Sequence, residues 1–176
     1  MTNGTPPKAP EHLDGIDLKI LAELQDNGRI PINELVSRVG VSRPNGLRRL
    51  RSLLRRGVIK AIRATLDEKL LGYGVMSFVS LQLETQAEPA LRAFEERVAG
   101  MAGIQQCWRI SGDTDYLLKC VAPDVETMRE QLLRFAATPG VRTVRTYLVL
   151  GTVKDEPLPI PSGGKPDGNV IEPGES

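Results

Sequence analysis

Reactive side chains and long apolar runs are scarce in this sequence of 176 residues. The only histidine is His12, and the only cysteines are Cys107 and Cys120. A lone histidine beside a proline-rich start cannot anchor a catalytic triad or a zinc site, and two cysteines are too few for a disulfide scaffold. No run of about 18 apolar residues is present, and residues 1–10 lack the apolar stretch of a secretory signal. We therefore expect a cytoplasmic protein that does not enter a membrane, holds no metal or other cofactor and is not an enzyme.

The charge is distributed unevenly, although the net charge is only +1. Residues 1–70 carry 13 Lys and Arg against 8 Asp and Glu, whereas residues 71–176 carry 10 against 14. Hydrophobic residues make up 40%, which is ordinary for a globular protein. The two halves are therefore expected to meet different partners.

Both ends of the chain are polar and rich in proline or glycine, and they are predicted to be disordered over residues 1–12 and 155–176. Apolar residues at helical spacing predict three short helices between them, in a domain over residues 13–58. The turn between the second and third helices is Gly40-Val41-Ser42, which is typical of a helix-turn-helix. Residues 59–74 are expected to form a linker strand. We expect Ser42 to cap the third helix with its side chain.

The periodicity changes in residues 75–154. Strands are predicted over 75–83, 104–111, 116–122 and 141–150, with helices that begin near Pro89 and after Asp124. The order β-α-β-β-α-β is that of the ferredoxin-like unit. The predicted class is α+β, with an N-terminal helix-turn-helix domain, winged-helix-like, and a C-terminal ferredoxin-like domain.

The third predicted helix carries the signal for DNA binding. Between Arg38 and Arg63 there are nine basic residues and no acidic one. The apolar face of this helix, formed by Leu47, Leu50, Leu53 and Leu54, is expected to turn its arginines outward. Its first residues would meet base edges, and its later arginines would meet phosphate. The predicted DNA-binding residues are Ser42, Arg43, Asn45, Arg48, Arg49, Arg51, Arg55 and Arg56.

A solvated basic helix face is the alternative to DNA binding, and for a charge run alone it is the more common explanation. The absence of interleaved acids and the tight turn before the helix favour DNA. Double-stranded DNA offers the dense negative charge that such a helix needs, with one charge per about 1.7 Å of axis.

An ordered series of motifs resembles the leucine-responsive/asparagine-regulator (Lrp/AsnC) family of transcription factors. The series begins with Leu13-Asp14-Gly15-Ile16-Asp17 and continues through Asn27-Gly28-Arg29-Ile30, Leu71-Gly72-Tyr73, Ser111-Gly112-Asp113-Thr114-Asp115-Tyr116 and Pro139-Gly140-Val141. Pro31 and Asn45-Gly46 depart from the pattern. The resemblance implies dimers formed through the sheets, assembly to octamers, and an amino acid bound between dimers. It assigns the effector site to Gly112, Asp113, Thr114, Asp115, Leu148 and Val149.

The turn at residues 112–115 has chemistry that suits an amino acid. Gly112 permits a close approach of the backbone, and Asp115 could pair with an ammonium group. An ordinary hairpin loop, in which the aspartates bond to their own backbone, would have the same composition. The resemblance favours the sensor interpretation. Leu148 and Val149 suggest an apolar or sulfur-containing amino acid.

A tight hairpin at this turn would also place the two cysteines opposite each other. With Asp113-Thr114 as a two-residue loop, Cys107 faces Cys120 as a non-hydrogen-bonded pair. A redox switch and a reduced pair that fills the core are both compatible with that register.

The combined prediction is a sequence-specific transcription regulator whose oligomeric state or DNA affinity responds to an amino acid. The alternative is an architectural DNA-bending protein in which the second domain only oligomerises. A third possibility, an amino-acid-binding module of an enzyme, is disfavoured because the chain has its own DNA reader and no catalytic domain.

Overall fold

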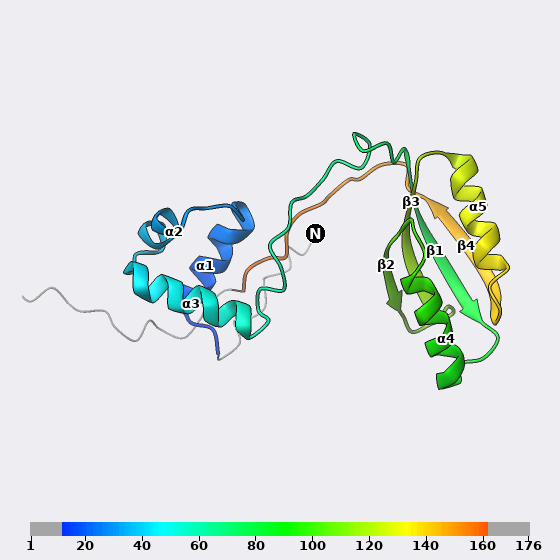
Figure 1. Ribbon diagram of the computed structural model, residues 1–176, viewed down its shortest axis with the longest axis horizontal. Coiled ribbons are helices and arrows are strands. Elements are labelled where there is room, and N and C mark those ends of the chain that lie inside the picture. The colour runs from blue at the N-terminus through cyan, green and yellow to red at the C-terminus, as the bar shows by residue number, and fades with distance from the viewer. Residues whose placement is uncertain (1–11, 162–176) are drawn as a thin grey trace, which may run out of the picture. The chain divides into compact units, whose positions relative to one another are not determined.

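The computed structural model describes residues 12–161, which divide into two compact units (Figure 1). One unit contains the N-terminal residues up to Ala64 together with a C-terminal stretch that starts at Asp155. The other unit runs over Thr65–Lys154. Residues 1–11 of the predicted arm and residues 162–176 of the predicted tail lie outside the described residues. Within residues 12–161, no helix is long and apolar enough to cross a membrane.

The first unit is built from α1 (Gly15–Asp26), α2 (Ile32–Val39) and α3 (Arg43–Arg55). Helix α1 begins where the Asp14 carboxylate accepts a hydrogen bond of 2.8 Å from the Asp17 N–H. Its apolar stripe packs on the stripes of the other two helices, and the shared core contains Leu13, Leu18, Ile20, Ile30, Leu35, Val39 and Leu53. The predicted three-helix domain is therefore present.

Residues 59–74 do not form the predicted linker strand. They contain a bend, turns and otherwise irregular backbone but no strand, and the described residues therefore include no β-wing beside the three helices. A β-strand needs a neighbouring strand to pair with its backbone groups, and within residues 12–161 the first strand of the sheet begins at Val75. One turn of this segment, at Asp67–Leu70, is instead fixed by a local contact. The Asp67 carboxylate accepts a hydrogen bond of 3.0 Å from the Leu70 N–H.

Residues 155–161 contact the first unit, although the sequence predicts a disordered tail there. Gln25 Nε2 donates a hydrogen bond of 2.9 Å to the Leu158 carbonyl, and Ile160 packs against the helical core. The disorder prediction is thus wrong for this stretch. The reason is that Ile160 buries apolar surface on residues more than a hundred positions earlier, which local composition does not reveal.

The second unit has the predicted β-α-β-β-α-β order. Its elements are β1 (Val75–Leu83), α4 (Glu88–Ala99), β2 (Ile104–Arg109), β3 (Tyr116–Ala122), α5 (Val125–Ala136) and β4 (Val141–Leu148). The four strands form one antiparallel sheet in the order β2-β3-β1-β4 (Figure 1). This is the ferredoxin-like arrangement, and the predicted fold class is confirmed.

Both helices of the second unit cover the same face of the sheet. Leu91 and Phe94 of α4 and Phe135 of α5 join one core with Val79 and Leu81 of β1. Because side chains alternate along a strand, the neighbouring positions point to the opposite face. That face, here called the open sheet face, carries Met76, Phe78, Trp108, Leu117 and Tyr147.

The open sheet face leaves aromatic side chains in contact with solvent. Trp108 is 40% exposed and Tyr147 is 55% exposed. Tyr147 pairs with Phe78 across β4 and β1, and Trp108 pairs with Leu117 across β2 and β3. Exposed aromatic side chains that gather on one face of a sheet are typical of a protein–protein interface.

Candidate functional site

The turn between α2 and α3 has the geometry of a helix-turn-helix. Gly40 ends α2 in the left-handed conformation, with φ of 81°, and its N–H bonds to the Val36 carbonyl. Ser42 is the N-cap residue of α3, but its side chain makes no cap hydrogen bond, contrary to the prediction. Pro44 explains the difference in part, because it removes one of the two first-turn N–H groups that a serine side chain normally caps.

Gly46 lets α3 approach α2 closely. It is buried, and a Cβ atom at this position would overlap Cγ1 of Val36. The departure from the family pattern at Asn45-Gly46 therefore has a steric explanation. Alanine would suit a helix better by about 1 kcal/mol, so the glycine is retained here for contact and not for helix propensity.

Arg49 points inward, although it was predicted to contact DNA. Its Nη1 lies 2.6 Å from Asp14 Oδ2 and 2.8 Å from Asp17 Oδ1, and its side chain is only 18% exposed. Burial alone would raise the pKa of Asp14, but the Asp17 N–H and the Arg49 guanidinium outweigh burial and hold that pKa below its usual range. Arg49 therefore ties α3 to α1 and is not available to DNA in this arrangement.

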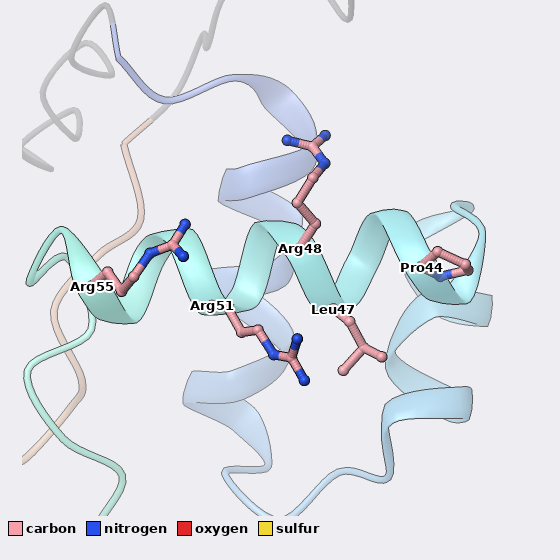
Figure 2. A pocket seen from close by; sticks show the side chains of 5 residues that line it. All are labelled: Pro44, Leu47, Arg48, Arg51 and Arg55. Carbon is pink, nitrogen blue, oxygen red and sulfur yellow. The ribbon is translucent and has the colours of Figure 1, made fainter.

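The outward face of α3 presents the other arginines. Pro44, Leu47, Arg48, Arg51 and Arg55 line a shallow hollow of about 340 Å³ on this helix (Figure 2). Their spacing of three, one, three and four residues places them on one helix face. Among residues 12–161, no carboxylate lines the hollow. Seen from this side, Leu47 and Arg51 project from one flank of the helix and Arg48 from the other (Figure 2).

The remaining predicted DNA-binding residues surround this hollow or lie at the ends of α3. Arg48 Nη2 donates a hydrogen bond of 2.9 Å to Asn45 Oδ1, so these two side chains are oriented together. Arg43 is exposed in the first turn. Arg56 follows the helix and donates to the His12 carbonyl at 2.8 Å. Leu47 was assigned to the buried face by its leucine spacing, but it lies among the arginines instead.

The predicted effector turn is a loop of residues 110–115 rather than a two-residue hairpin. The last paired residues of β2 and β3 are Arg109 and Tyr116. Thr114 Oγ1 donates a hydrogen bond of 2.6 Å to the Leu81 carbonyl, which fixes the loop to the end of β1. Gly112 adopts a φ of 125°, a conformation that other residues rarely take.

Asp115 is held by the protein itself. The carboxylate is buried, accepts a hydrogen bond from the Leu83 N–H at 2.7 Å and accepts another from Gln86 Nε2 at 2.8 Å. The pairing of Asp115 with an effector ammonium stays a prediction, and the ammonium would have to compete with these two donors for a buried carboxylate. Asp115 thus bonds to residues outside its own loop, unlike the aspartates of the ordinary hairpin alternative, and Gly112 and Asp113 are exposed.

Leu148 and Val149 lie at the end of β4. Leu148 pairs with Ser77 of β1 and is 47% exposed, and the Val149 N–H donates to the Met76 carbonyl. Leu148 is the last residue of the edge strand β4 and Val149 follows it. Both lie beside the start of β1, whereas the loop at 110–115 is bonded to its end, so one chain does not bring all the predicted effector residues together.

The cysteines do not face each other. Cys107 pairs with Leu118, because the turn is centred one residue earlier than predicted, and Cys120 pairs with Ile104 beyond a bulge in β2. Both thiols are free. Burial, and secondarily the nearby Cys107, raise the pKa of Cys120 to about 11, which keeps this thiol protonated and unreactive. Within residues 12–161, no group of three or more His, Cys, Asp and Glu side chains is placed to hold a metal.

Comparisons with known proteins match both units. Residues 13–60 match the winged helix-turn-helix DNA-binding family, and residues 76–159 match the Lrp/AsnC ligand-binding domain. The chain is 44% identical to the leucine-responsive regulatory protein of Rhizobium meliloti over 144 residues. This match covers 81% of this chain and 92% of that protein. It is 42% identical to the protein of the same name from Escherichia coli K12 over 146 residues. This match covers 81% of this chain and 87% of the relative.

Solved structures give a matching result. A transcriptional regulator from Neisseria meningitidis, in complex with L-Met, is 30% identical with a TM-score of 0.78, over 83% of this chain and 95% of that chain. An AsnC family transcriptional regulator from Agrobacterium tumefaciens is 30% identical with a TM-score of 0.76, over 82% and 94% of the two chains.

The contact between Gly46 and Val36 can be tested by substitution. Gly46→Ala should lower the free energy of unfolding by about 1–3 kcal/mol, because the new Cβ overlaps Val36. In a Val36→Ala background the same change should instead raise it by up to about 1 kcal/mol, since alanine favours a helix. Chemical denaturation of the four proteins measures both effects. Equal effects in the two backgrounds would contradict the contact.

Proposed function

Because the chain belongs to the Lrp/AsnC family of transcriptional regulators, we propose that the exposed arginine face of α3 reads DNA and that an amino acid bound near residues 110–115 alters this reading. Members of the family are regulators, not enzymes, with a DNA-binding helix-turn-helix and a ligand-binding domain. The observation that carries the proposal is the separation of the α3 arginines, with Arg49 paired inward and Arg48, Arg51 and Arg55 presented outward.

The arginines are proposed to divide the tasks of base recognition and phosphate binding. The N-terminal turns of a recognition helix meet base edges in the major groove, so Arg43, Asn45 and Arg48 are placed to read sequence. Arginine can bridge O6 and N7 of guanine, and the hydrogen bond from Arg48 to Asn45 pre-orients its guanidinium. Ser42, Arg51, Arg55 and Arg56 would bind phosphate oxygens and so contribute affinity more than sequence choice.

Unfavourable charge crowding supports a polyanionic partner for this face. Arg48, Arg51 and Arg55 recur at spacings of three and four residues, where like charges on a helix repel each other. Arg38, in contrast, is neutralised within the protein, since it lies 3.0 Å from Glu23 and 2.6 Å from Glu34. Arg38 is therefore omitted from the proposed interface.

The effector is proposed to bind against the exposed part of the loop. Gly112 and Asp113 present backbone groups and a carboxylate to solvent. Leu148 and Val149 lie at the other end of β1 from this loop, so their apolar surface would join the site from another copy of the chain. Thr114 and Asp115 would position this loop through their bonds to β1 and Gln86. The Neisseria regulator was solved with L-Met, which supports an amino acid with an apolar or sulfur-containing side chain.

Two copies of the chain are proposed to associate through the open sheet face, with further assembly of dimers toward octamers. Burying aromatic and aliphatic residues such as Phe78, Trp108 and Tyr147 against a second copy would remove apolar surface from water. A dimer supplies two copies of α3, which can bind half-sites about one DNA turn apart. An effector that prefers one assembly over another would then shift DNA affinity.

The division of tasks between the arginines predicts different losses for two variants. Arg48→Ala should weaken binding to a preferred sequence by about 1–3 kcal/mol and leave binding to random DNA nearly unchanged. Arg51→Ala should weaken both equally and reduce the salt dependence, because it removes a phosphate contact. Fluorescence anisotropy with both duplexes measures these losses, with Arg92→Ala, on α4, as the control. Unchanged affinities in both α3 variants would contradict the proposed interface.

The effector site predicts a specific thermal shift. At about 100 times its dissociation constant, the effector should add about 2.7 kcal/mol to stability, which raises the unfolding midpoint by a few degrees. L-Met and L-Leu are the first ligands to compare, with D-Met as the stereochemical control. Asp113→Ala should reduce the shift, whereas Asp115→Ala should lower the midpoint even without ligand, because Leu83 and Gln86 lose their acceptor. No shift with any amino acid would favour an architectural DNA-bending protein.

The open sheet face predicts a change of oligomeric state. Tyr147→Glu introduces a charge on this face and should shift the protein toward monomer in sedimentation velocity experiments. Leu133→Glu is the matched control, because Leu133 is 57% exposed but lies on α5, on the covered side of the sheet. A Tyr147→Glu protein that keeps the mass of the wild type would contradict dimerisation through this face.

A further inference from the structure

Leu47 occupies an unusual place on α3. Leu50 and Leu53 of the same helix pack in the core of the first unit, and Leu53 is fully buried. Leu47 is only partly buried and lines the outer hollow with Pro44, Arg48 and Arg51 (Figure 2). Leu47 is thus an apolar side chain on the arginine-bearing face of α3, and it is not among the residues that pack in or against the helical core.

The position of Leu47 along the helix is also informative. It is the fifth residue of Arg43–Arg55, directly before Arg48 in the sequence and one turn before Arg51. This is the half of a recognition helix that lies close to base edges in the major groove. The close packing at Gly46 fixes the helix immediately beside it, so the direction of the Leu47 side chain is set by the fold.

We propose that Leu47 is a specificity-determining residue that recognises thymine by packing against its 5-methyl group. This inference rests on the proposed function of α3 as a DNA reader. In the major groove, thymine alone among the four standard bases presents a methyl group, and apolar side chains distinguish it by contact. Pro44 forms the neighbouring apolar wall of the hollow. Arg48, just beside Leu47, would hydrogen-bond to a neighbouring guanine, so the two residues together would read adjacent bases.

The test begins with the full-length protein and a preferred duplex obtained by selection from random DNA. Each thymine of that duplex is then replaced singly by deoxyuridine, which differs only by the missing methyl group. Affinities are measured for the wild type, Leu47→Ala and Leu54→Ala. Leu54 is the matched control, because it is a 43% exposed leucine about two turns further along the same helix, outside the hollow.

The expected result is one thymine in each half-site whose replacement weakens wild-type binding by about three- to fourfold, as expected for one buried methyl group. Leu47→Ala should bind the thymine and deoxyuridine duplexes equally, and Leu54→Ala should retain the wild-type difference. Leu47→Ala should also keep its affinity for random DNA and its thermal midpoint, which a merely structural role of Leu47 would lower.

Two results would overturn the proposal, and they have different meanings. If the wild type and Leu47→Ala lose the same factor at every deoxyuridine, or neither loses any, Leu47 does not read thymine, although α3 remains the DNA reader. If selection returns no preferred sequence and Arg48→Ala and Arg51→Ala bind DNA as the wild type does, the proposed DNA interface itself fails and Leu47 with it.

Discussion

The attachment of α3 to the two preceding helices is the constraint on which the DNA-binding unit depends. Three contacts fix it: Leu53 in the core, Gly46 against Val36, and Arg49 between Asp14 and Asp17. The ion pairs do more than add a modest amount of stability. They join the start of α1 to the middle of α3, and so they determine which arginines remain on the outer face. An arginine that is buried beside two carboxylates is costly to release, because its charge and theirs would lose their partners.

In the second unit, one face of the sheet packs against the helices, and we propose that the other face binds a second copy of the chain. Helices α4 and α5 cover one face, and within the described part of the second unit no helix covers the apolar residues of the other face. The loop at 110–115 is divided in the same manner. Asp115 and Thr114 hold it to β1, and this leaves Gly112 and Asp113 exposed. A loop that is held rigidly at one end is better suited to bind a small ligand than a mobile one, because less entropy is lost on binding.

Several site residues could not be assigned from sequence, and each has a physical reason. A side chain on a charged helix can point to solvent or to a partner distant in sequence, and Arg49 finds Asp14 and Asp17 more than thirty positions earlier. The same holds for Asp115, because its carboxylate accepts hydrogen bonds from Leu83 and Gln86, about thirty positions earlier. Leu47 was assigned by its spacing to the core, but the apolar stripe of α3 is narrower than its leucines suggest. The predicted cysteine register is wrong because the turn is centred between Gly112 and Asp113, one residue earlier than predicted, so every pairing beyond it moved.

The sequence by itself determined the order and type of the helices and strands, the ferredoxin-like unit and the basic character of α3, together with the family. These features depend on periodicity, turn residues and local charge, which are properties of neighbouring positions. Only the tertiary structure decided which polar side chains are held inside the protein and which remain available. It also decided that β1 would have strands on both sides while residues 59–74 would have none, and that Ile160 would join the helical core. Those outcomes depend on contacts between residues far apart in the chain, where packing and hydrogen bonding override local preference.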